Sequence, residues 1–504
     1  MTLDKYCNKK DKEHNFSINI EFDTKINVTS RILEISEAFG LGIDEMKKFV
    51  VYKDFNIGFN KGDVIYITGD SGGGKTILLK YLQDKLENTI DLSDIIPEPD
   101  EQIIESIGQD LNESVYYLSM MGLNDAFIFL RKYKELSDGQ KYRYRLAKAL
   151  SMNPYYLFVD EFCANLDRTT AKVISYNLQK ICRKNNITLC CATTHTDIEY
   201  DLNPSVKVLK KFMDDVYIEY NDYVARKISF YSDIYIEEGN ISDFHKLKKY
   251  HYKNTSTRFP YCKIVRATLY GELIGIAVYS PPFLQTKGRT IKFNKKYSLM
   301  TKPIVAEINK LFIRRSRNIV SPKYRGCGLG QKLALDSMAF VSTKKYVEAI
   351  NIMGKYTPVN DKIGMERIEI TEETDSAAIK LDKWLKENNC VVKEINNSKY
   401  WTNWIKTLSS KKKNELKLLT GKVLHHPKIG ISSKDGKRAE VVKQEKRYKE
   451  VDFKEVRTEI ISYIPKLYAG MTLYYIMNNP FYKEVKEINL GDFNKQNGTN
   501  NRRV

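Results

Sequence analysis

Apolar runs of strand length alternate with stretches of helical periodicity in the first half of the chain. Val64–Thr68, Tyr155–Val159 and Leu189–Ala192 are short and almost wholly apolar, the pattern of strands buried on both faces of a parallel sheet. Ile77–Leu82 spaces its apolar residues at helical intervals and follows the first run after a glycine-rich turn. Strands that alternate with helices predict an α/β fold for this half.

The region before the first apolar run is less regular. Residues 1–30 show little periodicity, and we expect them to form an N-terminal extension. Arg31–Phe39 predicts a short helix that ends at Gly40. Val50–Phe59 alternates like a pair of strands that leads into the first buried strand.

The second half has strands and helices in a different arrangement. A hairpin is predicted over Lys263–Tyr279 around the turn Gly271–Glu272, and a strand region over Ile308–Val320. Further predicted elements are strands at Ile234–Ile236 and Val347–Ile352 and helices at Asp243–Tyr250 and Gln331–Phe340. We expect a second domain here, separated from the first by the polar break Glu219–Tyr223.

Between the first strand and its helix the chain fits G-x-x-x-x-G-K-[ST]. The residues are Gly69, Asp70, Ser71, Gly72, Gly73, Gly74, Lys75 and Thr76. Glycines let backbone N–H groups converge on phosphate oxygens, and the helix N-terminus adds partial positive charge, so this is a phosphate-binding loop in its proper context. Lys75 is expected to bridge the outer phosphates of ATP, and Thr76 to bind Mg²⁺ through its hydroxyl.

Further motifs follow in order along the first half. They are Gln109; Leu136, Ser137, Asp138, Gly139 and Gln140 before a basic helix; Asp160 and Glu161 at the end of an apolar strand; Asp167; and His195 at the end of another strand. This order and spacing over about residues 45–215 resemble an ABC-type ATPase. Asp138 stands where the signature of that family usually has glycine.

The resemblance implies a role for each residue near the phosphates. Asp160 and Gln109 would bind the metal, and Glu161 would be the general base for the attacking water. An isolated histidine more often packs in a core, but His195 follows Glu161 by 34 residues at a strand end, which favours a donor to the γ-phosphate. Phe49 and Tyr52 are the nearest aromatics for stacking on adenine, although core packing is favoured for either.

The resemblance also implies a homodimer. In this family the signature segment and Asp167 contact ATP bound to a second module, and the chain holds one phosphate-binding loop and one signature. No apolar run approaches the roughly 18 residues that span a bilayer, and the N-terminus has no apolar signal region. We therefore expect a soluble, cytoplasmic ATPase without a membrane partner.

Composition adds a possible polyanionic partner. The chain has 504 residues and a formal net charge of +19, and from Trp401 onward 22 Lys and Arg face 11 Asp and Glu, a local excess of +11. Nucleic acid and a plain solvated basic surface are equally compatible with this balance. The eight cysteines are scattered without C-x-x-C spacing, which favours reduced thiols over disulfides or zinc.

A second glycine loop lies in the second half. It comprises Val320 at the end of the predicted strand and Arg325, Gly326, Cys327, Gly328, Leu329 and Gly330 before the next helix. Arg-x-x-Gly-x-Gly in this position resembles the acetyl-CoA loop of GNAT-type N-acetyltransferases. The resemblance implies an α+β domain over about residues 230–395 whose backbone N–H groups and helix N-terminus hold the pyrophosphate of acetyl-CoA.

The catalytic candidates of this second domain rest on resemblance. Tyr356 follows the last core strand, where such enzymes often have a tyrosine acid for the leaving thiolate. His251 together with Gly271–Gly275 and Pro281–Pro282 resembles, more loosely, phage acyltransferases that modify DNA adenine. Packing or surface exposure is at least as compatible with both Tyr356 and His251.

The combination resembles a family of ABC-type ATPases fused to an acetyltransferase domain, an architecture that defines no substrate. We expect an N-terminal extension (1–30), an ABC-type ATPase domain (31–220), a GNAT-type domain (221–400) and a small basic C-terminal region (401–504). In the last region Trp401 and Trp404 either stack on bases or pack in a helical domain. Three functions stay open: an ATPase coupled to acylation of a nucleic acid base, acetylation of protein or a small amine with ATP as a switch, and a non-enzymatic nucleic-acid clamp that senses acetyl-CoA.

Overall fold

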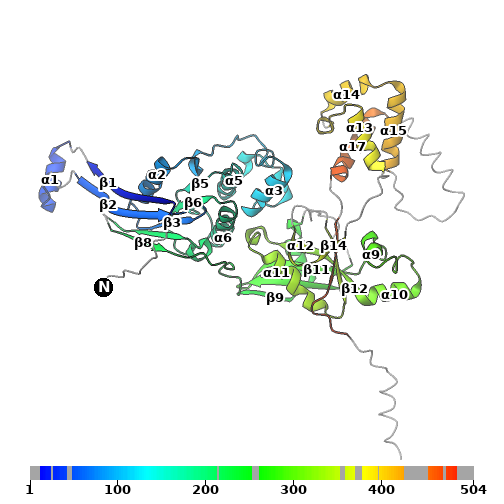
Figure 1. The fold of residues 1–504 in the computed structure, drawn as a ribbon. Coiled ribbons are helices and arrows are strands. Elements are labelled where there is room, and N and C mark those ends of the chain that lie inside the picture. The colour runs from blue at the N-terminus through cyan, green and yellow to red at the C-terminus, as the bar shows by residue number, and fades with distance from the viewer. Residues whose placement is uncertain are drawn as a thin grey trace, which may run out of the picture. The chain divides into compact units, whose positions relative to one another are not determined.

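The computed structural model describes residues 12–23, 27–42, 48–212, 215–251, 260–351, 358–368, 377–395, 397–424, 452–468 and 473–484 (Figure 1). The chain divides into two compact units. The first comprises Met1–Pro281, Arg315–Thr343 and Pro480–Val504, and the second comprises Pro282–Arg314 and Lys344–Asn479. These units differ from the four consecutive segments expected from the sequence, because each is assembled from stretches that lie far apart in the chain.

A six-stranded sheet organises the nucleotide-binding part of the first unit. Its order is β4 (Thr89–Asp91), β5 (Tyr156–Val159), β6 (Thr188–Ala192), β3 (Val64–Gly69), β7 (Val206–Lys210) and β8 (Val216–Tyr220). Neighbouring strands are parallel except β7 and β8, which pair antiparallel. The helices are α2 (Lys75–Lys85), α3 (Leu111–Met120), α4 (Ala126–Phe129), α5 (Asp138–Ser151), α6 (Arg168–Lys184) and α7 (Glu199–Leu202). The expected α/β fold is confirmed for this part of the chain.

Two hydrophobic cores cover this sheet. Val64 and Tyr66 of β3 belong to one core, and Ile65 and Ile67 of the same strand belong to the other. All four side chains are fully buried. Successive residues of a strand point to opposite faces, so a strand covered on both sides has to be apolar at every position.

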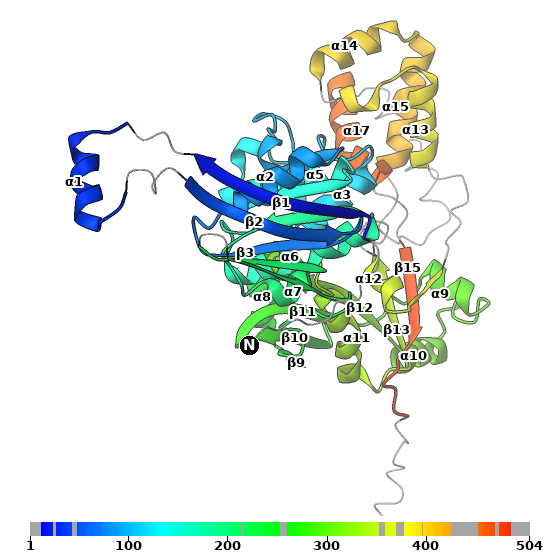
Figure 2. The same cartoon turned by 60° about the vertical axis from the view of Figure 1, so that its left-hand side comes forward.

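An antiparallel ribbon precedes this sheet. β1 (His14–Asp23) pairs with β2 (Lys48–Phe59), and α1 (Ser30–Phe39) connects them in sequence (Figure 2). The expected N-terminal extension therefore contains a strand, with Ile18 fully buried, and the expected pair of strands is one long strand. The helix ends at Gly40 as expected, because this glycine adopts the left-handed conformation with φ 63°.

The rest of the first unit combines strands of a second sheet with helices. β9 (Ile234–Glu238), β10 (Lys263–Leu269), β11 (Glu272–Ser280) and β12 (Phe312–Val320) are neighbours in this order, and β10 pairs antiparallel with both β9 and β11. The other elements are α8 (Ile241–Leu247), η3 (Lys248–Tyr250), η4 (Pro322–Tyr324), α11 (Leu329–Asp336) and η5 (Ser337–Val341). The hairpin turns at Tyr270–Gly271, one residue earlier than expected, since both residues have positive φ and Leu269 pairs with Glu272.

The second unit combines strands with a helical cluster. β15 (Leu473–Asn478) pairs antiparallel with β13 (Tyr346–Asn351) and β14 (Glu366–Ile368). The helices are α9 (Lys287–Lys292), α10 (Lys302–Leu311), α12 (Val359–Lys362), α13 (Ala377–Glu387), α14 (Ser398–Thr407), α15 (Ser410–Leu424) and α17 (Phe453–Tyr468), with the short η6 (Val392–Glu394). Ile308 is therefore helical, whereas the sequence predicted a strand region from this residue.

Aromatic residues of the expected basic C-terminal region lie in two different cores. Trp401 and Trp404 are buried in the core of α13–α15 and α17, and Tyr474 and Tyr475 are buried in β15. These four side chains pack inside the protein, so they do not offer surfaces for stacking on bases. In the part of the chain that the structure describes, no helix has both the length and the apolar character needed to cross a membrane.

Candidate functional site

The glycine-rich loop joins β3 to α2, as predicted. Gly69 has φ 125°, and a Cβ at this position would lie 1.8 Å from the carbonyl oxygen of Lys210. Gly74 has φ 100°, and a Cβ there would lie 2.4 Å from Cγ1 of Val51. Both positions thus require glycine for two reasons, a left-handed backbone and close approach of neighbouring atoms.

Lys75 and Thr76 begin α2 and point to groups around the loop. The Lys75 ammonium donates to the carbonyl oxygens of Gly69 (3.0 Å) and Asp70, and burial lowers its pKa against the opposing carboxylates of Asp160 and Asp70. The Thr76 hydroxyl donates to Oδ2 of Asp160 at 2.6 Å. The fold thus joins two residues 84 positions apart that the sequence assigned to one metal site. A hydroxyl and a carboxylate are hard oxygen ligands of the kind Mg²⁺ binds, so these residues fit that ion.

Glu161 follows Asp160 in a strained turn after β5. Its backbone has φ 48°, and its N–H donates to Oδ1 of Asp160 at 2.9 Å. The next residue, Phe162, is fully buried and its N–H donates to the carbonyl of Ala192 in β6. The buried phenylalanine holds the turn against the sheet, while the Glu161 side chain stays exposed to solvent.

His195 and Gln109 lie in loops after β6 and before α3. The half-buried His195 accepts a hydrogen bond at its carbonyl from the Tyr66 hydroxyl (2.8 Å), and its N–H donates to Oγ1 of Thr193. Gln109 is exposed, and its N–H donates to Oε2 of Glu113 at 2.8 Å. These contacts hold the backbones of both residues and do not involve their side chains.

Two residues that the sequence did not assign a role link neighbouring loops. Arg168, the residue after Asp167, forms a two-pronged ion pair with Asp197, with 3.0 Å from Nε to Oδ2. Asp197 lies two residues after His195, so the pair connects the start of α6 to the histidine loop. The sequence did hold a signal for this contact, because two residues of opposite charge, Arg168 and Asp197, each lie within two residues of a motif residue.

The signature segment forms the start of α5. Ser137 precedes the helix, and its N–H donates to Oε1 of Gln140 at 3.0 Å. Leu136 is buried, and a Cβ on Gly139 would lie 3.3 Å from Cδ2 of Leu166. The Asp138 side chain is 96% exposed, which places the residue that departs from the family pattern on the open surface.

The two candidate adenine-stacking residues have different environments. Tyr52 is 1% exposed, and its hydroxyl donates to the carbonyl of Gly74 at 3.2 Å, so its predicted packing role is confirmed. Phe49 is 39% exposed and contacts the ring of Phe212, with 6.1 Å between centroids. Phe212 follows the segment that contacts Gly69 and Gly73, so this exposed aromatic pair lies near the phosphate-binding loop.

No protein-family model matches the chain. The chain is 29% identical over 175 residues to the alpha-hemolysin translocation ATP-binding protein HlyB of Escherichia coli O157:H7, covering 27% of this chain and 25% of that protein. It is 26% identical over 201 residues to the lipoprotein-releasing system ATP-binding protein LolD of Leptospira interrogans, covering 31% of this chain and 84% of that protein. The chain contains an ABC-type nucleotide-binding domain.

Two further comparisons concern this ABC-type domain. The methionine import ATP-binding protein MetN of Clostridioides difficile is 27% identical over 187 residues, which cover 30% of this chain and 58% of that protein. A solved dimeric ATP-binding cassette in a post-hydrolysis state, bound to ADP and phosphate, has a TM-score of 0.30 at 16% identity and covers 40% of this chain and 98% of its own. The match to HlyB spans a quarter of the length of that relative.

The second glycine loop follows β12 and precedes α11. Gly326 has φ 86° and Gly328 has φ 93°. A Cβ on Gly326 would lie 2.2 Å from Nδ2 of Asn177, whereas a Cβ on Gly328 would meet only Cε2 of Tyr231, at 3.9 Å. Gly326 is therefore used for packing, and the space beside Gly328 is open.

The other side chains of this loop are engaged inside the protein. Arg325 donates to four acceptors: the carbonyls of Val320, Asn124 and Tyr250 and Oδ1 of Asn124. Burial lowers the pKa of Arg325 to about 10, so the guanidinium remains charged at neutral pH. The side chains of Val320, Cys327 and Leu329 are at most 8% exposed. Any ligand would therefore meet the backbone near Gly328 and Gly330 and not these side chains.

Arg325 of this loop donates to the carbonyl of Tyr250, the residue before the catalytic candidate His251, at 3.3 Å. His251 ends η3, where its N–H donates to the carbonyl of Lys248 at 3.0 Å. Tyr356 lies outside the described residues. The seven described cysteines are free thiols in the structure, and Cys7 lies outside the described residues.

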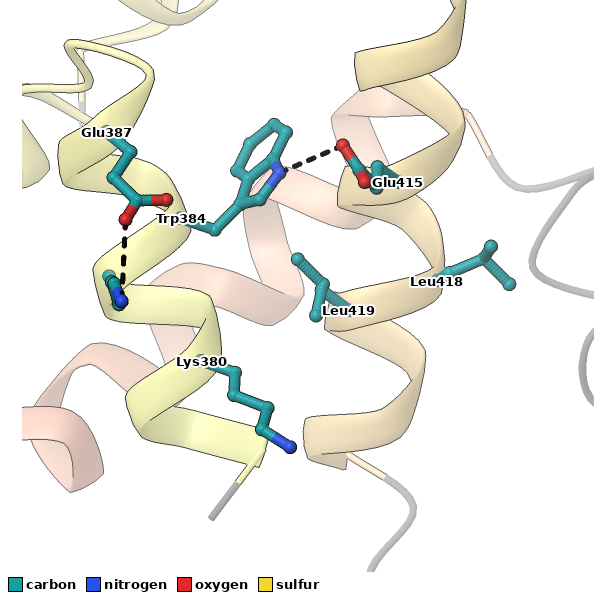
Figure 3. A pocket seen from close by; sticks show the side chains of 7 residues that line it. Lys380, Trp384, Glu387, Glu415, Leu418 and Leu419 are labelled. Carbon is teal, nitrogen blue, oxygen red and sulfur yellow. Dashed lines mark hydrogen bonds and ion pairs between the residues drawn. The ribbon is translucent and has the colours of Figure 1, made fainter. Parts of the chain in front are cut away.

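A pocket of about 430 Å³ lies elsewhere, between α13 and α15 of the second unit (Figure 3). It is lined by Lys380, Lys383, Trp384, Glu387, Glu415, Leu418 and Leu419. The Trp384 indole N–H donates to Glu415 at 3.2 Å across the pocket. None of the residues that the sequence assigned to a site lines it.

Proposed function

We propose that the ABC-type domain hydrolyses ATP with Mg²⁺ and that the residues of its phosphate-binding loop act as the sequence indicates. The hydrogen bond between Thr76 and Asp160 is the main support, because it brings two of the three expected metal ligands together at the start of α2. Bound Mg²⁺ neutralises charge on the phosphates during phosphoryl transfer. Glu161, next to Asp160 in its strained turn, is the proposed base for the attacking water.

The proposed ATPase works as a homodimer. The exposed start of α5 at Ser137–Gly139 would cap ATP on a second copy, so that each site is completed by the partner. Phosphoryl transfer depends mainly on positioning and charge neutralisation, so turnover would require both copies. His195 and Gln109 would face the γ-phosphate and the metal once the copies close.

Lys75→Ala is expected to weaken ATP binding by about 10- to 100-fold, because a hydrogen bond from a charged group to phosphate is lost. Calorimetric titration of ATP with Mg²⁺ measures this change, and phosphate release should fall with it. Lys80→Ala is the matched control, since Lys80 is exposed on the same helix. Equal affinities for the wild type and Lys75→Ala would contradict the proposed nucleotide site.

We further propose that the domain with the second glycine loop is a GNAT-type N-acyltransferase that uses acetyl-CoA. The open space at Gly328 supports this, because backbone N–H groups at the start of α11 can approach a pyrophosphate there. Two ammonium groups lie close to the same place: those of Lys227 and Lys332 are over the ring of Tyr231, at 5.1 and 5.2 Å, and Lys332 also pairs with Asp336. Tyr231 is the residue nearest to Gly328 in that space.

For the acceptor of the acyl group we propose candidates by chemical class. A nucleic acid base is the first candidate because the basic excess continues on the surface of α15, where Lys411 and Lys412 are exposed. A protein or small amine, with ATP as a switch, is the second candidate. A clamp that only senses acetyl-CoA would bind this cofactor and transfer nothing.

Replacing Lys411, Lys412 and Lys413 by alanine is expected to weaken nucleic acid binding and to reduce its salt dependence by a slope of about 2 to 3, because each phosphate contact releases counterions. Salt titrations of short DNA and RNA measure both effects. Substitution is preferable to deletion after Ser410, which would remove the buried Leu416 and strand β15. Equal slopes for the two proteins would reject α15 as the binding surface and favour the protein or small-amine acceptor.

A further inference from the structure

The second glycine loop is built against the ABC-type domain, within the first unit. The ammonium of Lys323 lies 2.8 Å from Oδ1 of Asp167. Arg325 donates to the carbonyl (2.8 Å) and to Oδ1 (2.7 Å) of Asn124, a residue 201 positions away between α3 and α4. The two loops that bear the expected ATP and acetyl-CoA contacts therefore share side-chain interactions.

Helix α6 contacts the loop and the segment before it at two places, its N-cap Asp167 and Asn177. Asp167 caps its N-terminus by accepting hydrogen bonds from the N–H and the hydroxyl of Thr170. Further along the helix, the fully buried Asn177 donates through Nδ2 to the carbonyls of Met120 (2.9 Å) and Arg325 (3.4 Å). The absence of a side chain at Gly326 lets the loop approach Asn177 closely. A displacement of the start of α6 would therefore move groups that contact the loop.

Arg325 of the loop and Lys323 just before it are held to the ABC-type domain by contacts of different stability. The half-buried Arg325 donates to four acceptors, so breaking its contacts would leave a partly desolvated charge without partners, which is costly. In the Lys323–Asp167 pair the lysine side chain is 34% exposed and the aspartate side chain 57% exposed. Ion pairs with such access to water contribute little to the free energy of unfolding. The contacts of Arg325 are therefore expected to persist, whereas a small displacement of Asp167 can break its ion pair with Lys323.

We propose that Lys323 couples the nucleotide state of the ABC-type domain to the affinity of the second glycine loop for acetyl-CoA; this inference rests on the acyl-CoA function and the homodimer proposed above. In the proposed dimer Asp167 turns to the ATP site of the partner copy, which releases Lys323. The freed ammonium adds positive charge beside a loop that takes a pyrophosphate, and acetyl-CoA binds more tightly. Lys323 is a positioning residue in this account, because it acts through Asp167 and through charge near the loop.

The coupling has to be reciprocal. If ATP tightens acetyl-CoA binding by a given factor, acetyl-CoA tightens ATP binding by the same factor. We expect a factor of about five, at the lower end of the usual range for linked sites, because one partly exposed charge is involved. A contribution from packing alone would not depend on the charge at position 323.

The test is calorimetric titration of the full chain with acetyl-CoA, with and without a non-hydrolysable ATP analogue and Mg²⁺. The wild type and Lys323→Arg should bind acetyl-CoA about fivefold more tightly with the analogue, because arginine keeps the charge. Lys323→Gln should bind acetyl-CoA with one affinity under both conditions. Lys263→Gln is the matched control, since Lys263 forms a similarly exposed pair with Glu238 and should keep the fivefold change.

The outcomes separate this inference from the function on which it rests. Two results would overturn the coupling and leave the acyl-CoA site in place. One is a wild-type affinity for acetyl-CoA that does not change with the analogue, and the other is a fivefold change in affinity that persists in Lys323→Gln. Failure of the wild type to bind acetyl-CoA under either condition would overturn the acyl-CoA site and the coupling together. Loss of the change in Lys323→Gln alone, with reciprocal factors for the two ligands, is the expected result.

Discussion

Glu161→Gln is expected to bind ATP as the wild type does and to lose turnover by about 100-fold or more, because an amide cannot accept the proton of the attacking water. The phosphate-binding loop is untouched by the change. The hydrogen bond from residue 161 to Asp160 is made by the backbone N–H and persists in the variant. Glutamine also tolerates the left-handed turn, at φ 48°, about as well as glutamate does.

Two measurements check this prediction. Phosphate release under saturating ATP gives the loss in kcat, and light scattering should show a dimer that persists as long as ATP is present. Glu87→Gln is a suitable control, because Glu87 is exposed in the loop after α2 and should leave both readouts unchanged. Turnover near the wild-type rate in Glu161→Gln would assign the base to another residue.

The ABC-type part was predictable because its signals are local. The run Val64–Ile67 is apolar at each position since both faces of β3 are covered, and the glycine loop follows it directly. The contact between Thr76 and Asp160 spans 84 positions, yet each residue has a fixed place beside a predicted strand. Parallel strands bring such places to one edge of a sheet, which explains why two residues that the loop motif and the family resemblance each assigned to Mg²⁺ lie in contact.

Other features were missed for different reasons. β1 has a local signal that the prediction overlooked, because Phe16, Ile18, Ile20 and Phe22 alternate with polar residues. β15 has no such signal of its place, because it completes a sheet whose other strands precede it by more than a hundred residues. Strand formation depends strongly on the partner, which propensity alone does not identify. The contact of Arg325 with Asn124 likewise depends on how two distant segments meet, so the sequence assigned Arg325 to a ligand-binding loop and did not indicate its role in packing.

Gly328 provides the most direct test of the second loop, because its surroundings differ from those of Gly326. A side chain at position 326 would collide with Asn177 and disturb the fold, whereas the space beside Gly328 is open. Substitution at Gly328 costs about 1–2 kcal/mol for the left-handed backbone at φ 93°, which a domain of this size can tolerate. The open space is also where the proposed pyrophosphate lies, so a negative side chain there acts on the ligand.

Gly328→Glu is therefore expected to abolish acetyl-CoA binding, because its carboxylate occupies the space and repels the pyrophosphate, while ATP hydrolysis is retained. Gly328→Ala is the matched control, since it introduces the same backbone strain with only a methyl group and should weaken binding less. Calorimetry with acetyl-CoA measures both affinities, and incubation with labelled acetyl-CoA and separate DNA, RNA and protein pools shows whether label transfer stops as well. Acetyl-CoA binding that is equal in the wild type and Gly328→Glu would mean that this loop is a structural turn, and the open space beside it would then need another ligand.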